Sequence, residues 1–165
     1  MAWYVEELIE ALLFILPAYV ANAAPLLLTP WMRVRHPMDF GLSMSDGKRI
    51  LGDTKSWEGF AFGITLGTFT GALISKPLLG LALSVGAMIG DLAGSFIKRR
   101  AGIEPGHPIP VLDQLDFLVG ALILAYILGE TLSPVKVLIL VVITPPIHLA
   151  TNTFAYLLGF KDRPY

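Results

Sequence analysis

The chain has 165 residues, of which 55% are hydrophobic and 15% are charged, and its formal net charge is −1. These values exclude a soluble enzyme and a nucleic-acid-binding protein, since both need more surface charge, and the absence of cysteine excludes a disulfide-linked secreted protein. The apolar runs are long enough to cross a hydrocarbon core, which takes about 20 helical residues. The sequence therefore predicts an all-α integral membrane protein.

Five apolar segments are expected to form transmembrane helices in a single membrane-embedded domain over residues 1–165. Glu6 and Glu7 precede the first segment, which is therefore expected to be a membrane helix rather than a signal peptide. The last segment is expected to be interrupted at Pro145 and Pro146, because proline removes a backbone donor. The segments span about residues 7–28, 59–74, 78–97, 113–128 and 135–158.

Basic residues are distributed unequally between the two sides of this arrangement. An odd number of spans puts loops 29–58 and 98–112 and the C-terminal tail on one side, with only Lys76 and Lys136 on the other. Because cytoplasmic loops carry the excess of Lys and Arg, these loops should be cytoplasmic and the N-terminus outside. The basic residues on the cytoplasmic side are Arg33, Arg35, Lys48, Arg49, Lys55, Lys98, Arg99, Arg100, Lys161 and Arg163.

Small residues recur every four positions in the second and third segments. Residues four apart share a helix face, and small side chains let two helix backbones pack closely in lipid. We therefore expect these two helices to form a tight pair. The second segment carries Gly59, Gly63, Gly67 and Gly71, and the third carries Ala82, Gly86, Gly90 and Gly94.

Asp91 lies inside the third apolar segment. A carboxylate at such depth is costly unless it faces a polar cavity, a cation or a partner, so it marks a candidate functional site. Ser95 and Lys98 follow on the same helix face, and Arg99 lies slightly round from them. The alternative is structural: a contact between Asp91 and Ser95 within the helix, with Lys98 extending its charge to the membrane surface.

Asp113 and Asp116 begin the fourth segment, three residues apart and thus on one side of its first turn. Taken alone, this pattern is also how many helices are capped. Together with Asp91, the three carboxylates would meet at the cytoplasmic edge beside Lys98. Such a set suits Mg²⁺, which binds through a few carboxylates plus substrate oxygens.

The loop over residues 46–58 combines basic residues with glycine. Lys48, Arg49 and Lys55 can contact phosphate, while Gly47 and Gly52 allow close backbone approach. The spacing is not that of a Walker A loop. The alternative is an ordinary basic cytoplasmic loop, without a role in binding.

Several motifs together resemble the integral-membrane CDP-diacylglycerol synthases, or phosphatidate cytidylyltransferases. Residues 55–59, Lys-Ser-Trp-Glu-Gly, resemble that family's Lys-Thr-Trp-Glu-Gly element. The family's C-terminal signature is matched, in order, by Gly90-Asp91, Ser95, Lys98-Arg99, Pro105-Gly106-His107 and Asp113-x-x-Asp116.

The chain departs from the bacterial and eukaryotic members in three details. A Lys-Asp pair is missing after Lys98-Arg99, Pro108 replaces the first of two glycines, and Gln114 stands where that family has Arg. A compact five-span form with these changes is similar to the archaeal branch, the CDP-archaeol synthases.

The resemblance implies a CTP-dependent nucleotidyltransferase of the cell membrane, with its active site on the cytoplasmic side and Mg²⁺ as cofactor. Its substrates would be CTP and 2,3-bis-O-geranylgeranyl-sn-glycerol 1-phosphate, and its products CDP-archaeol and pyrophosphate. The catalytic residues would be Asp91, Lys98, Asp113 and Asp116, with Asp91, Asp113 and Asp116 as metal ligands. CTP and its phosphates would be bound by Lys48, Arg49, Gly52, Asp53, Thr54, Lys55, Ser56, Glu58, Ser95 and Arg99.

The implied reaction needs no general base. Its nucleophile is a phosphomonoester whose second pKa is about 6 and which is therefore already ionised. Catalysis would depend on in-line positioning and charge stabilisation. The sequence shows no Ser-His-Asp or Cys-His arrangement, in agreement with that chemistry.

Other functions remain open at this point. The lipid could be phosphatidic acid, as in the CDP-diacylglycerol synthases. A CDP-alcohol phosphotransferase is disfavoured, because Asp46-Gly47-Lys48-Arg49 does not continue as that family's motif requires. A small cation-coupled transporter could also use an intramembrane carboxylate such as Asp91.

Four further polar residues, Asn22, His107, His148 and Asn152, lack a role in this scheme. His148 and Asn152 share a helix face, which is compatible with a lipid-headgroup lining or with an interhelical hydrogen bond. Asn22 has the same two interpretations. His107 lies in a cytoplasmic loop, where a structural role is expected.

Overall fold

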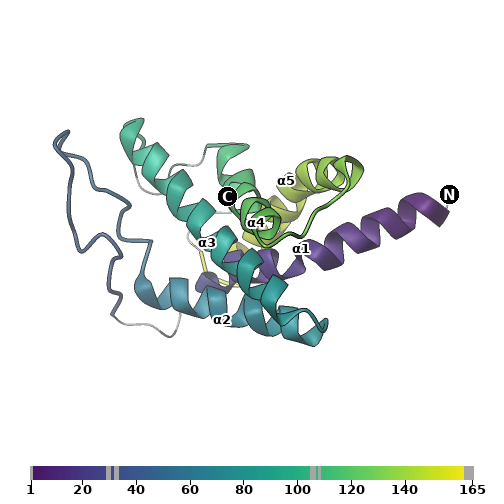
Figure 1. The fold of residues 1–165 in the computed structure, drawn as a ribbon. Coiled ribbons are helices and arrows are strands. Elements are labelled where there is room, and N and C mark those ends of the chain that lie inside the picture. The colour runs from purple at the N-terminus through teal and green to yellow at the C-terminus, as the bar shows by residue number, and fades with distance from the viewer. Residues whose placement is uncertain (1, 29–30, 32–33, 105–106, 108, 162–165) are drawn as a thin grey trace.

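The structure, a computed structural model, describes residues 2–28, 31, 34–104, 107 and 109–161 (Figure 1). Its five helices confirm the all-α class, and the described residues form no more β-structure than two isolated bridges. Arg33, Pro105, Gly106, Pro108 and Arg163, which entered the charge count or the motifs, lie outside the described residues. The helices are α1 (Ala2–Leu28), α2 (Trp57–Leu73), α3 (Pro77–Arg100), α4 (Leu112–Ile127) and α5 (Pro134–Leu157).

Local capping explains where two of these helices begin. Ser56 precedes α2, and its hydroxyl accepts a hydrogen bond from the Gly59 amide at 3.2 Å. Ser133 caps α5 in the same way, accepting from the Lys136 amide at 3.3 Å, and Pro134 occupies the first helical position. Both arrangements satisfy amides that have no partner inside the helix.

The expected interruption of the last helix is wrong, because α5 continues through Pro145 and Pro146. The two rings remove two backbone donors, but their fixed φ is close to the helical value. The preceding residue also holds this turn in place. Thr144 is fully buried, its hydroxyl donates to the Leu140 carbonyl at 2.6 Å, and the Tyr19 hydroxyl of α1 lies 2.7 Å from it.

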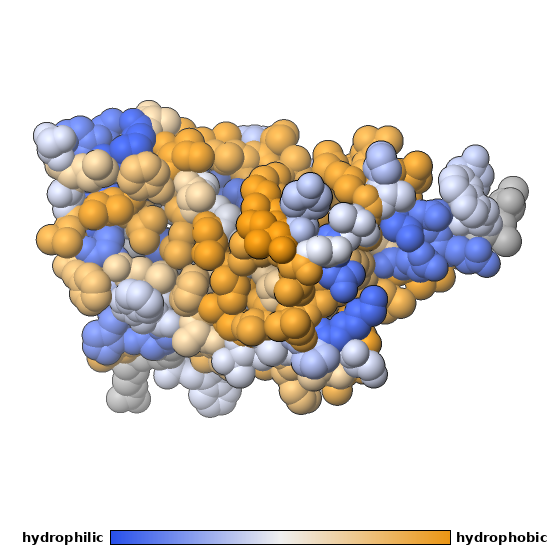
Figure 2. All heavy atoms as spheres, viewed as in Figure 1, coloured by the Kyte–Doolittle hydropathy of each residue, from blue (hydrophilic) through white to orange (hydrophobic). Residues whose placement is uncertain are grey.

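Three of the helices are long and apolar enough to cross a membrane: α1, α3 and α5. The other two, α2 and α4, have 17 and 16 residues, near the lower limit for a span. Apolar side chains cover the middle of the face shown in Figure 2, while polar ones gather toward its two ends. This distribution fits a bundle whose middle lies in hydrocarbon.

The glycines of α2 face α1 and α3 together. A Cβ added to Gly67 would lie 2.6 Å from the Pro17 carbonyl oxygen, and one on Gly63 would lie 2.7 Å from that of Ala21. Toward α3, the close approach is between Gly71 and Gly80. Bare glycine faces thus let α2 pack against two neighbours at once.

The expected tight pairing of α2 with α3 is confirmed where Gly71 meets Gly80, but the small-residue stripe at Gly86 and Gly90 faces another helix. Cβ atoms on Gly86 and Gly90 would overlap the backbone of α4, at the carbonyl oxygens of Gly120 and Asp116. The stripe therefore packs α3 against α4 rather than against α2. Sequence spacing identifies a close-packing face but not the helix that occupies it.

One end of the bundle gathers the C-terminal ends of α1, α3 and α5 and the N-terminal ends of α2 and α4. The loop between α1 and α2 lies at this end, on the left in Figure 1. At the opposite end, Lys136 pairs with Glu10 at 2.5 Å and with Glu7 at 3.8 Å. The loops predicted to share one side of the membrane therefore share one end of the fold.

Candidate active site

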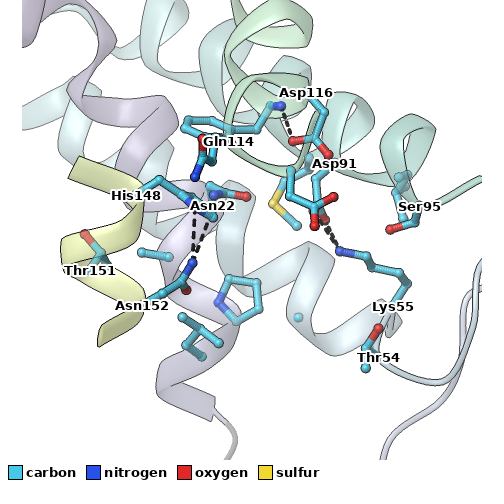
Figure 3. A pocket seen from close by; sticks show the side chains of 18 of the residues that line it. Asn22, Thr54, Lys55, Asp91, Ser95, Gln114, Asp116, His148, Thr151 and Asn152 are labelled. Carbon is cyan, nitrogen blue, oxygen red and sulfur yellow. Dashed lines mark hydrogen bonds and ion pairs between the residues drawn. The ribbon is translucent and has the colours of Figure 1, made fainter. Parts of the chain in front are cut away.

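A cavity of about 900 Å³ opens at the loop end of the bundle, and all five helices contribute to its walls. Figure 3 shows polar side chains from different helices pointing into it. The predicted site residues that line the cavity are Thr54, Lys55, Ser56, Asp91, Ser95, Lys98, Asp113 and Asp116. The first and last of them, Thr54 and Asp116, lie 62 positions apart in the chain, and tertiary packing brings the set together.

Asp91 of α3 is paired with a lysine from the loop before α2. Lys55 Nζ donates to both carboxylate oxygens of Asp91, at 2.7 and 2.6 Å. The two side chains are 22% and 23% exposed, so the pair lines the cavity without being sealed from it. Within the described part of the chain, Asp91 makes no hydrogen bond with Ser95, which removes the structural alternative for this residue.

Asp113 is held by a second lysine. Lys98 Nζ donates to its two carboxylate oxygens at 2.9 and 2.8 Å, and the Ile109 amide donates to the same carboxylate at 3.0 Å. Asp113 is therefore not the N-cap, since α4 begins after Val111. Lys98 accordingly points into the site instead of extending to the surface.

Asp116 shares the α3 side of the cavity with Asp91, and Figure 3 shows the two carboxylates as neighbours. Its Oδ1 accepts a hydrogen bond from the Phe117 amide at 2.6 Å. Its other oxygen lies against Gly94, where any Cβ would overlap it. The α3 glycine stripe thus has a chemical consequence, because it makes room for this carboxylate.

The loop residues 48–53 lie outside the cavity and build the loop itself. The buried carboxylate of Asp39 binds Arg49 at 2.6 and 3.2 Å and accepts the amides of Gly41, Leu51 and Gly52 at 3.0–3.1 Å. Burial alone would raise the pKa of Asp39, but Arg49 and these amides outweigh it and hold the pKa far below its usual range. Sequence reasoning missed Asp39, since its partners Arg49, Leu51 and Gly52 are 10–13 residues away and no motif marks it.

Three other predicted binding residues of this region, Lys48, Asp53 and Glu58, also have structural partners. Arg49 extends to Asp53 at 2.7 Å, and Lys48 reaches the Arg100 carbonyl oxygen at 3.4 Å. Glu58 binds the His36 ring and accepts the His36 amide at 3.2 Å. These contacts fasten the loop to itself and to α2 and α3.

Arg99, another predicted binding residue, lies neither in the cavity nor in the loop network. Its side chain is buried at 6% exposure, and its Nε and Nη1 have no hydrogen-bond partner in the described part of the chain. It does not line the cavity.

The polar residues without an assigned role line the same cavity. On α5, Asn152 Nδ2 lies 3.1 Å from His148 Nδ1, and Lys161 donates to Asn152 Oδ1 at 3.1 Å. The bond between His148 and Asn152 lies within one helix, which corrects the interhelical interpretation. Asn22 and His107 also face the cavity.

Comparison with known proteins decides the family. The family model described as CarS-like, CDP-archaeol synthase, matches residues 4–78 and 69–165. The CDP-archaeol synthase of Thermofilum pendens is 45% identical over 94% of this chain and 80% of its own length. That of Pyrococcus furiosus is 44% identical over 97% of this chain and 99% of its own length. The chain belongs to the CDP-archaeol synthase family.

A solved structure supports the same conclusion at the level of the fold. It was described as an intramembrane enzyme for archaeal membrane lipids biosynthesis, and it matches with a TM-score of 0.76 and 40% identity over 88% of this chain and 94% of its own. The expectation of a membrane cytidylyltransferase of archaeal lipid biosynthesis is thereby confirmed, and the transporter and phosphotransferase alternatives are not supported.

The chemistry of the CDP-archaeol synthase family calls for a divalent cation, and the cavity supplies suitable ligands. No three His, Asp or Glu side chains within the described ranges are grouped tightly enough to hold a metal by themselves. Asp91 and Asp116 nevertheless offer hard oxygen atoms on one wall, where Lys55 already neutralises one of them. Mg²⁺ characteristically takes one or two carboxylates and completes its shell with water and substrate phosphates, so the residues fit such an ion.

Proposed function

We propose that this chain transfers CMP from CTP to the phosphate of 2,3-bis-O-geranylgeranyl-sn-glycerol 1-phosphate, forming CDP-archaeol and pyrophosphate. The observation that supports this most strongly is the pair of lysine–carboxylate contacts inside a bundle of apolar helices. Both substrates carry phosphate, and one also carries two isoprenoid chains. A charged cavity within a membrane bundle admits both kinds of group.

In this reaction an oxygen of the lipid phosphate forms a bond to the α-phosphorus of CTP. The bond from that phosphorus to the bridging oxygen breaks, and pyrophosphate leaves with the bonding electrons. The attacking oxygen is already ionised near neutral pH, so no side chain needs to remove a proton. The chain therefore contributes mainly position and charge.

Lys55 and Lys98 supply that charge from opposite ends of the α3 wall. Their ammonium groups bind phosphate oxygens, and the nearby hydroxyl groups of Thr54, Ser56 and Ser95 help to orient the nucleotide. Asp91, Asp113 and Asp116 would hold Mg²⁺. When bound there, Mg²⁺ would offset the negative charge of the phosphates.

The predicted binding residues that lie outside the cavity contribute to CTP binding indirectly, by holding the loop before α2 in its folded shape. Arg49, Gly52 and Asp53 belong to the network around Asp39, while Lys48 and Glu58 attach the loop to α3 and His36. A folded loop places Thr54, Lys55 and Ser56 at the mouth of the cavity. The excess of basic residues in these loops supports a cytoplasmic position for this mouth, on the side where CTP is found.

Pyrophosphate release by the purified protein in detergent tests the proposal. The reaction would contain CTP and Mg²⁺ with either the geranylgeranyl ether-lipid phosphate or phosphatidic acid, together with reactions lacking CTP or lipid. Release that requires CTP and the ether lipid together is the expected result. Preference for phosphatidic acid would assign the chain to diacylglycerol lipids instead, and no release with either lipid would contradict the proposal.

A further inference from the structure

Two polar walls face each other across the cavity, and the transfer described above uses only one of them. Figure 3 shows Lys55, Asp91 and Ser95 on one side and His148 and Asn152 on the other. The first wall comes from α3 and the loop before α2, while the second comes from α5. The α5 wall has no counterpart among the residues implied by the family motifs.

Lys161 adds a positive charge to this second wall. It follows α5 in the chain, lines the cavity, and donates to Asn152 Oδ1 at 3.1 Å. Asn152 is only 7% exposed and is itself fixed by His148 at 3.1 Å. The ammonium group is thus held by a buried amide at a set place in the cavity.

Lys161 lines the same cavity as Lys55 and Lys98 and interacts electrostatically with both. Burial lowers its pKa, the charge of Asp113 opposes this, and the positive charges of Lys55 and Lys98 lower it further. An added dianion would relieve the repulsion among these lysines.

The surroundings of the α5 wall suit a lipid rather than a nucleotide. Ile147, Leu149 and Phe160 line the cavity beside His148 and Asn152. Only 11% of the most apolar stretch of α5 is buried, against 33% for α1 and 50% for α3, so of these three helices α5 borders the bilayer most fully. A phosphorylated lipid reaching the cavity from the membrane would therefore meet this wall.

We propose that Lys161, positioned by Asn152 and His148, binds the phosphomonoester of the lipid substrate while the Lys55–Asp91 wall holds the phosphates of CTP. The proposal rests on the function proposed above. A phosphomonoester carries between one and two negative charges, and an ammonium donor binds it with a charge-assisted hydrogen bond. Two phosphates held on facing walls are brought together for in-line attack.

The test separates the affinity for each substrate. Lys161→Gln, Lys161→Arg and the control Lys76→Gln, an exposed lysine at the opposite end of the bundle, would be assayed for CDP-lipid formation with each substrate varied in turn. Lys161→Gln is expected to raise KM for the lipid about tenfold or more, as loss of a charged hydrogen bond implies, while KM for CTP stays within about twofold. Lys161→Arg should restore the lipid KM to within about threefold, and the control should match the wild type.

A second variant keeps the test informative if Lys161→Gln does not fold. Asn152→Ala retains the lysine but removes its support, and it should raise the lipid KM with little effect on the CTP KM. An unchanged lipid KM in the folded variants would overturn the proposal. So would an equal rise in the CTP KM or weaker inhibition by pyrophosphate, since either would assign Lys161 to the nucleotide. Absence of CDP-lipid formation by the wild type would instead refute the proposed function.

Discussion

Lys55 Nζ donates to both carboxylate oxygens of Asp91, at 2.7 and 2.6 Å, and so joins the loop before α2 to the inside of α3. The pair offsets the free-energy cost of placing an acidic group within an apolar helix, because the carboxylate has a cation beside it and a polar cavity in front. It also brings a phosphate-binding cation and a metal-binding anion to one point. Structure and chemistry at this site therefore depend on the same two side chains.

Replacing Asp91 by Asn should reduce turnover by at least about 10²–10³-fold, the usual effect of removing one group that stabilises charge in a transition state. The amide keeps the shape of the carboxylate but loses the charge that would hold a divalent cation. CTP-dependent pyrophosphate release measures the effect. Glu130→Gln, on the exposed turn after α4, is the matched control and should keep full activity. Full activity in Asp91→Asn would refute the metal assignment.

Reversing the charges of Lys98 and Asp113 should separate stability from catalysis. Each single reversal, Lys98→Asp or Asp113→Lys, places like charges side by side and should lower the melting temperature in detergent. The double reversal restores attraction, with a coupling energy of about 1 kcal/mol or more. Its activity should remain lost, because the cation and the anion no longer occupy the positions that the substrates need. Recovery of activity in the double variant would mean that the pair is only structural.

Alanine substitutions at Gly90 and Gly94 should affect different properties of the protein, stability in the first case and activity in the second. A Cβ on Gly90 overlaps the backbone carbonyl of Asp116, which cannot move away without shifting α4, so Gly90→Ala should lower thermal stability. A Cβ on Gly94 overlaps the Asp116 carboxylate, which can rotate, so Gly94→Ala should reduce activity more than stability. Both changes gain the same helix propensity of up to about 1 kcal/mol, and each therefore controls for the other. Melting temperature and pyrophosphate release would be measured on both variants. If Gly94→Ala kept full activity, Asp116 would have no role in turnover.

The Asp39 network should keep the loop before α2 ordered in mild acid. Because the pKa of Asp39 lies below its usual range in the folded loop, its carboxylate stabilises the loop above the ordinary value of about 3.9, and this stabilisation is lost only as pH falls through the lowered value. Hydrogen exchange of the Gly41, Leu51 and Gly52 amides should therefore show constant protection between about pH 7 and pH 5.

Asp39→Asn should reduce that protection by about tenfold or more at every pH, since hydrogen bonds to a charged group contribute about 1.5–3 kcal/mol. Asp53→Asn serves as the control, because that carboxylate is 79% exposed and, within the described part of the chain, binds Arg49 alone. Equal losses in the two variants would mean that Asp39 does not organise the loop.

The sequence by itself determined the membrane class, the helix positions to within a few residues and the family. Hydrophobic run length is a local property, so it can be read without knowing what any helix packs against. The spacing around Lys55, Asp91, Lys98 and Asp116 likewise identified residues that do line one cavity.

Tertiary structure alone decided which surfaces meet. It paired Gly86 and Gly90 of α3 with α4, and it kept α5 continuous through Pro145 and Pro146, next to a buried Thr144 that contacts Tyr19. It also turned Arg49 toward Asp39 and brought Lys161 into the cavity. These outcomes depend on contacts between residues far apart in the chain, and local spacing carries no information about such partners.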